Sequence, residues 1–386
     1  MISVENTIRD ARALIRIDSQ NPGPFEGQCA EWIGNRLTDF GLTPSRQSAD
    51  LSRSNIVAAI PGRGSASRLV LLAHMDTVPI GEGWTYPPLG AVLAGDRIYG
   101  RGACDMKAGL AVAINLLGWL AAAPIRPSGD VLLVATVDEE GPEMGGAHAL
   151  VASGLLQPDD QILALEPTGM RLRIAQMGLR WIRLTVFGRM AHAGRAHLGL
   201  DANHIMCRVI DDLKQAVSSL PHNDAILGRP RMTCGVFRGG IAPNVVPPSA
   251  EVQLDLRLVP PMTPGDVIAF VRERTEHVLS EFPGARYEVA PLGAERPAVR
   301  ADDNAKIVIA LRDAFRTCTQ AALPSGGDDG HEAYTDASMV AALTGSSSAT
   351  VFGPGTTDNA HTSDEYVSIA DIELTCRLMA ELVQNW

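Results

Sequence analysis

Three apolar segments in the first half of the chain each end in acidic or histidine-containing residues, which limits the possible folds more than any other feature. The segments and the residues after them are 69–73 with His74-Met75-Asp76, 131–137 with Asp138-Glu139-Glu140, and 162–165 with Glu166. Continuous runs of valine, isoleucine and leucine are typical of strands buried in a parallel sheet. The pattern therefore predicts an open α/β sheet with polar side chains at the carboxyl ends of its strands, where such sheets bind ligands.

A fourth polar segment, 100–107, precedes the apolar stretch 108–123. Carboxylates brought together at one sheet edge repel one another, which raises their pKa values unless a cation lies among them. The glycine-rich turn in this segment has neither of the two common phosphate-binding spacings, so a nucleotide cradle is disfavoured. We therefore expect the four polar segments to form a metal site.

The order of the predicted elements indicates two domains, as does the length of 386 residues. Strands and helices alternate up to 165, as in a mostly parallel sheet covered by helices. After Pro167 the strands alternate apolar and polar residues, as half-buried antiparallel strands do, and helical patterns cover 202–220 and 264–282, the latter capped by Thr263. The α/β pattern then returns. The predicted domains are a discontinuous catalytic domain at 1–177 and 292–386 and an inserted α+β domain at 178–291.

The other elements of the larger domain follow from the same periodicities. Strands are predicted at 55–60, 172–175 and 349–352, and helices at 4–17, 27–40, 107–123, 145–153, 302–317, 331–342 and 369–384.

Composition disfavours several classes of partner. The formal net charge of -11 and the presence of only three lysines disfavour nucleic acid, which needs clustered basic residues. We find no apolar run of the roughly 20 residues that a membrane-spanning helix needs, and no secretory signal at the start. Six widely spaced cysteines indicate buried, reduced thiols. We expect a cytoplasmic protein with no nucleic-acid or membrane partner.

Taken one at a time, the candidate residues have ordinary alternatives. His74 could bind a metal while Asp76 orients its ring, or the two could form a chance turn. Asp105 could bridge two metals or cap the following helix. The acids at 138–140 could surround a cation or lie at a solvated helix N-terminus. His361, in a loop after a predicted strand, could be a ligand or a surface histidine.

Together, the motifs resemble those of one known family. They are His74-Met75-Asp76-Thr77-Val78-Pro79, Gly100-Arg101-Gly102-Ala103-Cys104-Asp105-Met106-Lys107-Ala108-Gly109, Asp138-Glu139-Glu140-Gly141, Glu166-Pro167-Thr168, Ala191-His192-Ala193-Gly194, Pro243-Asn244-Val245-Val246-Pro247, Asp255-Leu256-Arg257, Thr335-Asp336-Ala337 and His361. The resemblance covers essentially the whole chain. It is to the co-catalytic metallohydrolases that include acetylornithine deacetylase, succinyl-diaminopimelate desuccinylase, aminoacylase and glutamate carboxypeptidase.

The resemblance implies a centre of two divalent cations bridged by Asp105. His74 and Glu166 would hold one cation, and Glu140 and His361 would hold the other. One histidine with carboxylates on each cation suits Zn²⁺, and Mn²⁺ or Co²⁺ accept the same ligands.

The resemblance also implies roles for residues beside the ligands. Asp76 would orient His74, and the peptide bond after Asp105 would be cis. Glu139 would be the general base, taking a proton from water and passing it to the leaving amine. His192 would steady the oxyanion in a neighbouring subunit's site, which implies a homodimer formed through the inserted lid domain; the alternative is a polar residue in a glycine-flanked turn.

Substrate contacts fall, by the same resemblance, on Arg257, Asn244, Thr335 and Asp336. Arg257 could grip a substrate carboxylate in a bidentate manner, or pair with Asp255 in a structural ion pair. Two divalent cations against three ligand carboxylates leave a formal charge of about +1, which favours an anionic substrate.

We therefore expect a dinuclear metal-dependent hydrolase that cleaves the amide bond of an N-acyl amino acid or small peptide-like substrate bearing a carboxylate. One alternative is a hydrolase of the same family that deaminates, or cleaves an amide of, an aromatic acid. Another is a non-catalytic, metal-stabilised binding protein, which would have no use for Glu139 as a base. The acidic loop 326–332 departs from the family pattern and leaves the substrate open.

Overall fold

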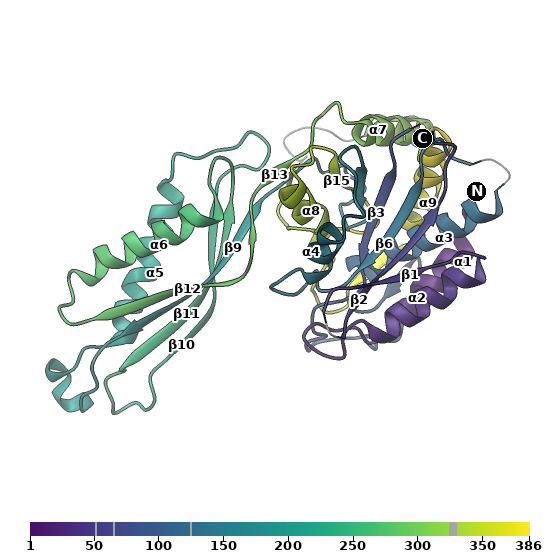
Figure 1. Cartoon of the computed structure of the whole chain (residues 1–386). Helices are drawn as coiled ribbons and strands as arrows, with labels where there is room; N and C mark the ends of the chain where they lie inside the picture. The colour runs from purple at the N-terminus through teal and green to yellow at the C-terminus, as the bar shows by residue number, and fades with distance from the viewer. Residues whose placement is uncertain (51, 65, 124–125, 324–329) are drawn as a thin grey trace. The chain divides into compact units, whose positions relative to one another are not determined.

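The chain forms two compact units (Figure 1). The computed structural model describes residues 1–50, 52–64, 66–123, 126–323 and 330–386. Unit 1 comprises Met1–Ala175 and Arg300–Trp386, and unit 2 comprises Gln176–Val299. Unit 2 ends beyond the predicted 178–291 because β12 (Arg286–Arg296) still pairs with β9 (Gly178–Phe187) after Pro291.

Within the described residues, unit 1 is built around a six-stranded sheet with the order β1-β2-β6-β3-β7-β15. Its strands are β1 (Ser45–Ser48), β2 (Ser54–Ile60), β3 (Leu69–His74), β6 (Val131–Thr136), β7 (Gln161–Ala164) and β15 (Ala349–Val351). The four strands from β6 to β15 are parallel, whereas β1 and β2 pair antiparallel. All residues of β3, β6 and β7 are buried, which explains the continuous apolar runs within them. The mostly parallel sheet is confirmed.

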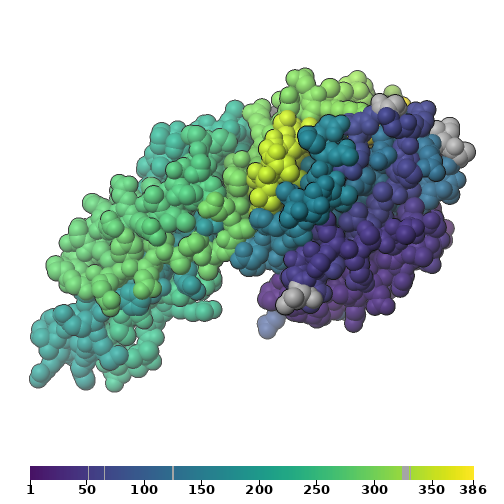
Figure 2. Space-filling model, viewed as in Figure 1, coloured from purple at the N-terminus to yellow at the C-terminus, as the bar shows by residue number. Residues whose placement is uncertain are grey.

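Helices cover both faces of this sheet (Figure 1). The helices on one face are α1 (Val4–Ile15), α2 (Gly27–Asp39), α3 (Ala108–Ala122) and α9 (Ile369–Gln384), with α7 (Lys306–Thr319) packed on α9; those on the other are α4 (Gly145–Ala152) and α8 (Asp336–Thr344). The space-filling view shows purple N-terminal side chains packed closely against blue side chains from later in unit 1 (Figure 2).

The most apolar helical stretch is longer than we expected. The stretch Ala103–Ala122 has 20 residues, and an 18-residue window within it has a mean hydropathy of 1.3. By length and composition alone, this helix could cross a membrane. Our expectation that no such run exists was therefore wrong. However, 89% of this window is buried inside the protein, because the stretch forms the central helix of the unit 1 core.

Several other boundaries also differ from prediction. Of the strand predicted at 172–175, only Ala175 lies in a strand, as the first residue of β8 (Ala175–Gln176). The helix predicted from 331 begins at Asp336, because Thr335 forms a reciprocal cap with the third helical residue. Short strands that we did not predict are β1, β4 (Val92–Ala94), β5 (Arg97–Tyr99), β13 (Val299–Arg300), β14 (Gly330–His331) and β16 (Tyr366–Ser368). Strands β4, β5 and β16 form a separate antiparallel sheet.

Unit 2, whose residues are all described, is a four-stranded antiparallel sheet with the order β10-β11-β9-β12. Its elements besides β9 and β12 are β10 (Arg231–Gly239), β11 (Ser249–Leu258), α5 (Ala202–Ser219) and α6 (Pro264–Leu279). Alternate residues of β9, Ile182, Leu184 and Val186, pack with both helices in one core. The predicted Thr263 cap opens α6. Two helices against an antiparallel sheet confirm the predicted fold class.

The six cysteines are free. Cys29, Cys104 and Cys376 are buried as expected, but Cys207 is exposed, and Cys234 and Cys318 are partly exposed. The expectation of buried thiols is therefore correct for only half of them.

Candidate metal centre

The carboxyl edge of the unit 1 sheet brings the predicted ligands together. His74 is the last residue of β3, Glu139 and Glu140 follow β6, and Glu166 lies two residues after β7. Strand β3 lies between β6 and β7 and pairs with both in parallel. Because all three strands run in the same direction, these side chains emerge next to one another.

Close backbone packing places Glu166. A Cβ on Gly109 would lie 2.0 Å from the carbonyl oxygen of Leu165, and one on Gly353 would lie 2.5 Å from it. No side chain fits at either glycine. Helix α3 and the chain after β15 therefore press against the backbone immediately before Glu166.

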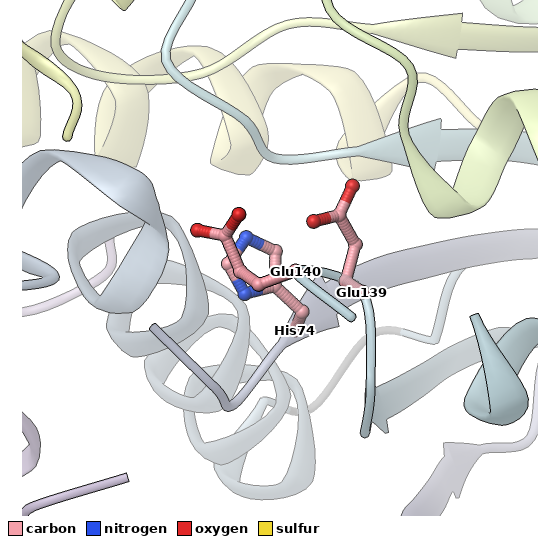
Figure 3. A group of neighbouring side chains, drawn as sticks. All are labelled: His74, Glu139 and Glu140. Atoms are coloured by element: carbon pink, nitrogen blue, oxygen red, sulfur yellow. The ribbon is translucent and has the colours of Figure 1, made fainter. Parts of the chain in front are cut away.

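Three groups of potential metal ligands occur in the part of the chain that the structure describes. They are His74–Asp105–Glu166, Asp105–Glu140–His361 and His74–Glu139–Glu140, and in each the ligand atoms lie within 4.8 Å of one another. Figure 3 shows the third group, in which the carboxylates of Glu139 and Glu140 point to the same side as the imidazole of His74. The first two groups share Asp105. Imidazole nitrogens and carboxylate oxygens at this spacing fit two divalent cations.

Asp105 lies between two imidazoles. Its Oδ1 is 3.0 Å from Nε2 of His74, and its Oδ2 is 3.3 Å from Nε2 of His361. Nε2 of His361 is also 3.0 Å from Oε1 of Glu140, and Nε2 of His74 is 3.7 Å from Oε2 of Glu166. The two oxygens of one carboxylate thus face different histidines, as a bridging ligand requires. The side chain of His361 is 51% exposed, whereas the other four are at most 14% exposed.

Asp105 does not cap the helix that follows it. It lies in η1 (Ala103–Lys107) with non-helical dihedral angles, φ -119° and ψ 96°, and Lys107 occupies the N-cap position of α3. The Asp105–Met106 peptide bond is cis, as the resemblance implied. The capping alternative for Asp105 is therefore excluded.

The side chain of Asp76 holds the acidic turn. Nδ1 of His74 lies 2.9 Å from the backbone carbonyl oxygen of Asp76 but 3.7 Å from its carboxylate. That carboxylate accepts hydrogen bonds from the backbone N–H groups of Glu139 at 3.2 Å and Glu140 at 3.1 Å, and from Nδ2 of Asn21 at 2.9 Å. Asp76 therefore orients His74 through its backbone and positions both glutamates through its side chain.

A network that we did not predict supports this turn. Asn21 also donates to Oδ1 of Asp138 at 3.0 Å, and Nη1 of Arg53 lies 2.9 Å from the same oxygen. Glu26 accepts the backbone N–H of Asp138 at 3.1 Å and pairs with Arg53. Asp138 has a φ of 64°, so the chain turns directly after β6 instead of starting a helix. Asp138 thus braces the turn, and the next two acids face the site.

Burial and mutual repulsion shift the pKa values of the site. Burial raises the pKa of Glu166 to about 8, and burial with the charge of Glu166 raises the pKa of Glu139 well above its ordinary value. Burial alone would lower the pKa of His361, but hydrogen bonds to two carboxylates raise it to about 11. Likewise, the charge of Glu166 and a hydrogen bond to Asp105 outweigh burial and hold the pKa of His74 well above its ordinary value. The acids attract positive charge, as a cation site does.

Thr335 and Asp336, the predicted substrate contacts of unit 1, lie at the start of α8 and are each 2% exposed. Burial raises the pKa of Asp336 to about 7, and its charge contributes to the raised pKa of Glu139. Asp336 is therefore electrostatically coupled to the site. Most of the acidic loop 326–332 lies outside the described residues.

The remaining predicted site residues belong to unit 2. His192 is exposed, and its Nδ1 accepts the backbone N–H of Gly194 at 3.0 Å. The neutral ring therefore carries its hydrogen on Nε2 and can donate it. The backbone oxygen of Asn244 accepts the N–H of Ala193 at 3.0 Å, which places Asn244 beside His192.

Arg257 forms the ion pair with Asp255 that we considered as the alternative to binding a substrate carboxylate. Its Nε and Nη2 bind the two carboxylate oxygens of Asp255 at 2.7 and 3.0 Å. Nε1 of Trp181 donates to the same carboxylate at 2.9 Å. The Arg257 side chain is 29% exposed, so its guanidinium is oriented but still partly accessible.

An α/β domain with this cluster at its strand ends, and with an α+β unit inserted in its sequence, is the architecture of a metal-dependent hydrolase. Residues 70–385 match the model of Peptidase family M20/M25/M40, and the chain belongs to this family. It is 28% identical over 361 residues to acetylornithine deacetylase of Proteus mirabilis, covering 92% of this chain and 88% of that one. It is 26% identical over 362 residues to a probable succinyl-diaminopimelate desuccinylase of Staphylococcus aureus, covering 84% and 85%.

Solved structures share the fold. A tripeptidase from Staphylococcus aureus has a TM-score of 0.81 at 23% identity, covering 100% of this chain and 98% of that one. An M20 family metallo-carboxypeptidase from Sulfolobus solfataricus has a TM-score of 0.80 at 18% identity, covering 98% of each chain. The family is metal-dependent. The protein is therefore a hydrolase that acts on amide C–N bonds.

Proposed function

We propose that the protein is a dinuclear metal-dependent hydrolase that cleaves the amide bond of an N-acyl amino acid or small peptide-like substrate bearing a carboxylate. The observation that carries the proposal is Asp105, whose two oxygens face His74 and His361 at 3.0 and 3.3 Å. The names of the two relatives describe removal of an acyl group from an amino acid. A structure of similar fold from Bacillus subtilis, with a TM-score of 0.71 at 16% identity, is described as a dinuclear metal binding peptidase.

The residues around Asp105 would hold two divalent cations, one with His74 and Glu166 and the other with Glu140 and His361. When bound, the cations supply Lewis acidity that makes water more acidic and polarises the amide carbonyl. Nitrogen and carboxylate donors suit Zn²⁺, and Mn²⁺ and Co²⁺ accept the same set.

Glu139 is the residue that moves the proton. Its backbone N–H is anchored on Asp76, and its carboxylate lies within 4.8 Å of a ligand atom of His74. Burial raises its pKa well above the ordinary value of a glutamate, and a general base is most effective when its pKa lies near the working pH. Glu139 takes a proton from water as the water oxygen attacks the amide carbon, and it delivers that proton to the leaving nitrogen. A metal-stabilised binding protein would have no use for this base.

Unit 2 would supply the dimer contact and an oxyanion donor. Four large apolar side chains of unit 2 are exposed, namely Met190, Leu198, Phe237 and Ile241. Strand β10 lies at the edge of its sheet and can pair with a second chain. His192 lies between the first two of these side chains in the sequence, and its Nε2–H would donate to the oxyanion formed in the partner's site.

The carboxylate of the substrate would be met by Arg257, which Asp255 already orients. Asn244, Thr335 and Asp336 would line the rest of the substrate site. A partly exposed guanidinium binds a carboxylate in a bidentate manner, which selects substrates with a free acid group.

The test is a screen of metal-reconstituted protein against N-acetyl, N-succinyl and aromatic-acyl amino acids, dipeptides and aminoaromatic acids. We expect wild type to bind two metal equivalents and to hydrolyse an amide that bears a carboxylate. We expect Glu139→Gln to bind both metals but to turn over about 10²–10⁴-fold more slowly. Wild type that binds two metals but hydrolyses no amide in the panel would contradict the proposal, as would release of ammonia from an aminoaromatic acid as its only activity.

A further inference from the structure

The two ligand groups around Asp105 are anchored in different ways. In the first group, His74 ends β3 and Glu166 follows β7, which are neighbouring strands of the central sheet. In the second group, His361 belongs to no helix or strand, has a φ of 63° and is 51% exposed. The position of His361 therefore depends on contacts that its segment makes elsewhere.

Glu365 attaches that segment to the turn that carries Asp105. Its Oε1 accepts the backbone N–H groups of Cys104 at 2.8 Å and Asp105 at 3.0 Å. Its Oε2 binds Nη1 of Arg101 at 2.6 Å, and its backbone oxygen accepts the N–H of Gly100 at 2.9 Å. One side chain thus connects the backbone of the bridging ligand to the segment of the exposed histidine.

Arg101 completes this attachment from the other side. Its Nη2 donates to the carbonyl oxygen of Ile80 at 3.1 Å, and its guanidinium lies 5.2 Å from the ring centroid of Trp84. Arg101 is 3% exposed and Glu365 is 0% exposed. Because both charges are buried, removing one of them leaves the other uncompensated.

We propose that the Arg101–Glu365 ion pair is a positioning device for the second cation. Glu365 holds the Asp105 turn and the His361 segment at a fixed separation, which keeps Nε2 of His361 3.3 Å from Oδ2 of Asp105. Without the pair, His74 and Glu166 stay fixed at the ends of β3 and β7, whereas His361 loses its geometry relative to Asp105. Both residues act through the ligands and touch neither cation nor substrate. This inference rests on the proposed dinuclear function.

The experiment titrates metal-free, full-length Glu365→Gln with Zn²⁺ by calorimetry and measures the bound metal by elemental analysis. Gln keeps the size of the side chain but removes its charge. We expect wild type to bind two equivalents, and the variant to keep the first affinity while the second weakens by about 10–100-fold, the usual effect of losing a residue that supports a ligand. Glu365→Asp keeps the charge but shortens the reach, and it should weaken the same step.

A matched control is available in the same unit. Arg68, 14% exposed, and Asp160, 1% exposed, form an ion pair with an N–O distance of 2.6 Å next to the opposite end of β7 from Glu166. Asp160→Asn should bind two equivalents with wild-type affinities. Thermal melts of the metal-free variants compare the losses of stability.

The outcomes separate the two proposals. Wild type that binds fewer than two equivalents contradicts the dinuclear function itself. If wild type binds two and the Glu365 variants bind the second as tightly, the function stands and the positioning role is overturned. Equal weakening of both sites, or weakening of the second site by Asp160→Asn, also overturns it, because the pair would then act only through general stability. A Glu365→Gln chain that does not fold leaves the decision to Glu365→Asp.

Discussion

Unit 1 holds its candidate residues inside, except His361, which is 51% exposed, whereas unit 2 displays its candidate residues at its surface. The His74 side chain is 1% exposed and that of Glu166 is 6% exposed, but His192 is exposed and Arg257 is 29% exposed. The parallel strands of unit 1 direct several acids to one buried edge. The antiparallel sheet of unit 2 buries one face against its helices and leaves the other face open.

The contrast indicates a division of labour. In unit 1, burial shifts pKa values strongly enough that the acids need a cation or protons. In unit 2, the exposed His192 has its Nδ1 occupied by the N–H of Gly194, so its Nε2–H is free to donate a hydrogen bond. The proton transfer is therefore expected from unit 1, and oxyanion stabilisation and binding of the substrate carboxylate from unit 2.

The largest effect is expected from Glu139→Gln in unit 1. Losing the base should lower kcat by about 10²–10⁴-fold, while the ligands keep both metals. Steady-state kinetics and metal content measure this. A variant with wild-type kcat would remove Glu139 from the mechanism and weaken the claim that unit 1 carries the proton transfer.

His192→Ala in unit 2 should lower kcat by about 10²–10³-fold, the effect of losing one oxyanion donor, without changing metal content. Mixing this variant with Glu139→Gln tests whether His192 acts across the dimer. One site of each mixed dimer then combines an intact Glu139 with an intact partner histidine, so activity should return. If refolded mixtures of the two variants stay inactive, His192 does not act in trans.

A smaller effect is expected from Asp76→Asn. The amide keeps only one accepting oxygen for the three donors that the carboxylate serves, so metal affinity should fall by about 10–100-fold. Asp255→Asn is the control in unit 2, where a carboxylate also accepts several hydrogen bonds. Metal calorimetry should show no change for the control, and equal losses in both variants would contradict the comparison.

The smallest effect concerns pH. The folded-state pKa of Glu166, about 8, exceeds its ordinary 4.5, and that of His361, about 11, exceeds 6.5. Both groups hold more protons folded than unfolded, so their contribution to stability is present at low pH and is lost as pH rises toward the folded-state values. Metal-free protein should therefore melt at a lower temperature at pH 8.5 than at pH 5.5. Zn²⁺ should raise the melting temperature most at the higher pH, because it displaces these protons. A metal-free melting temperature that rises between these pH values would contradict the shifts.

Long-range contacts explain what sequence reasoning missed. Asn21 meets Asp138 across 117 positions, and Arg101 meets Glu365 across 264. Neither pair belongs to a short pattern, and an isolated asparagine or arginine has many possible roles. The burial of Asp336 could not be predicted from the sequence either, because it depends on how α8 packs against the sheet.

The sequence by itself determined which strands are buried and that acids and histidines follow them, because a continuous apolar run ends where polar residues begin. It also determined the change to alternating strands in unit 2, which reflects one buried face. Only the tertiary structure decided that Asp105 faces two histidines, that the Asp76 carboxylate serves the backbone of the glutamate turn, and that Glu365 secures the segment of His361. Each of these depends on distances between segments far apart in the chain, which packing sets and local periodicity does not encode.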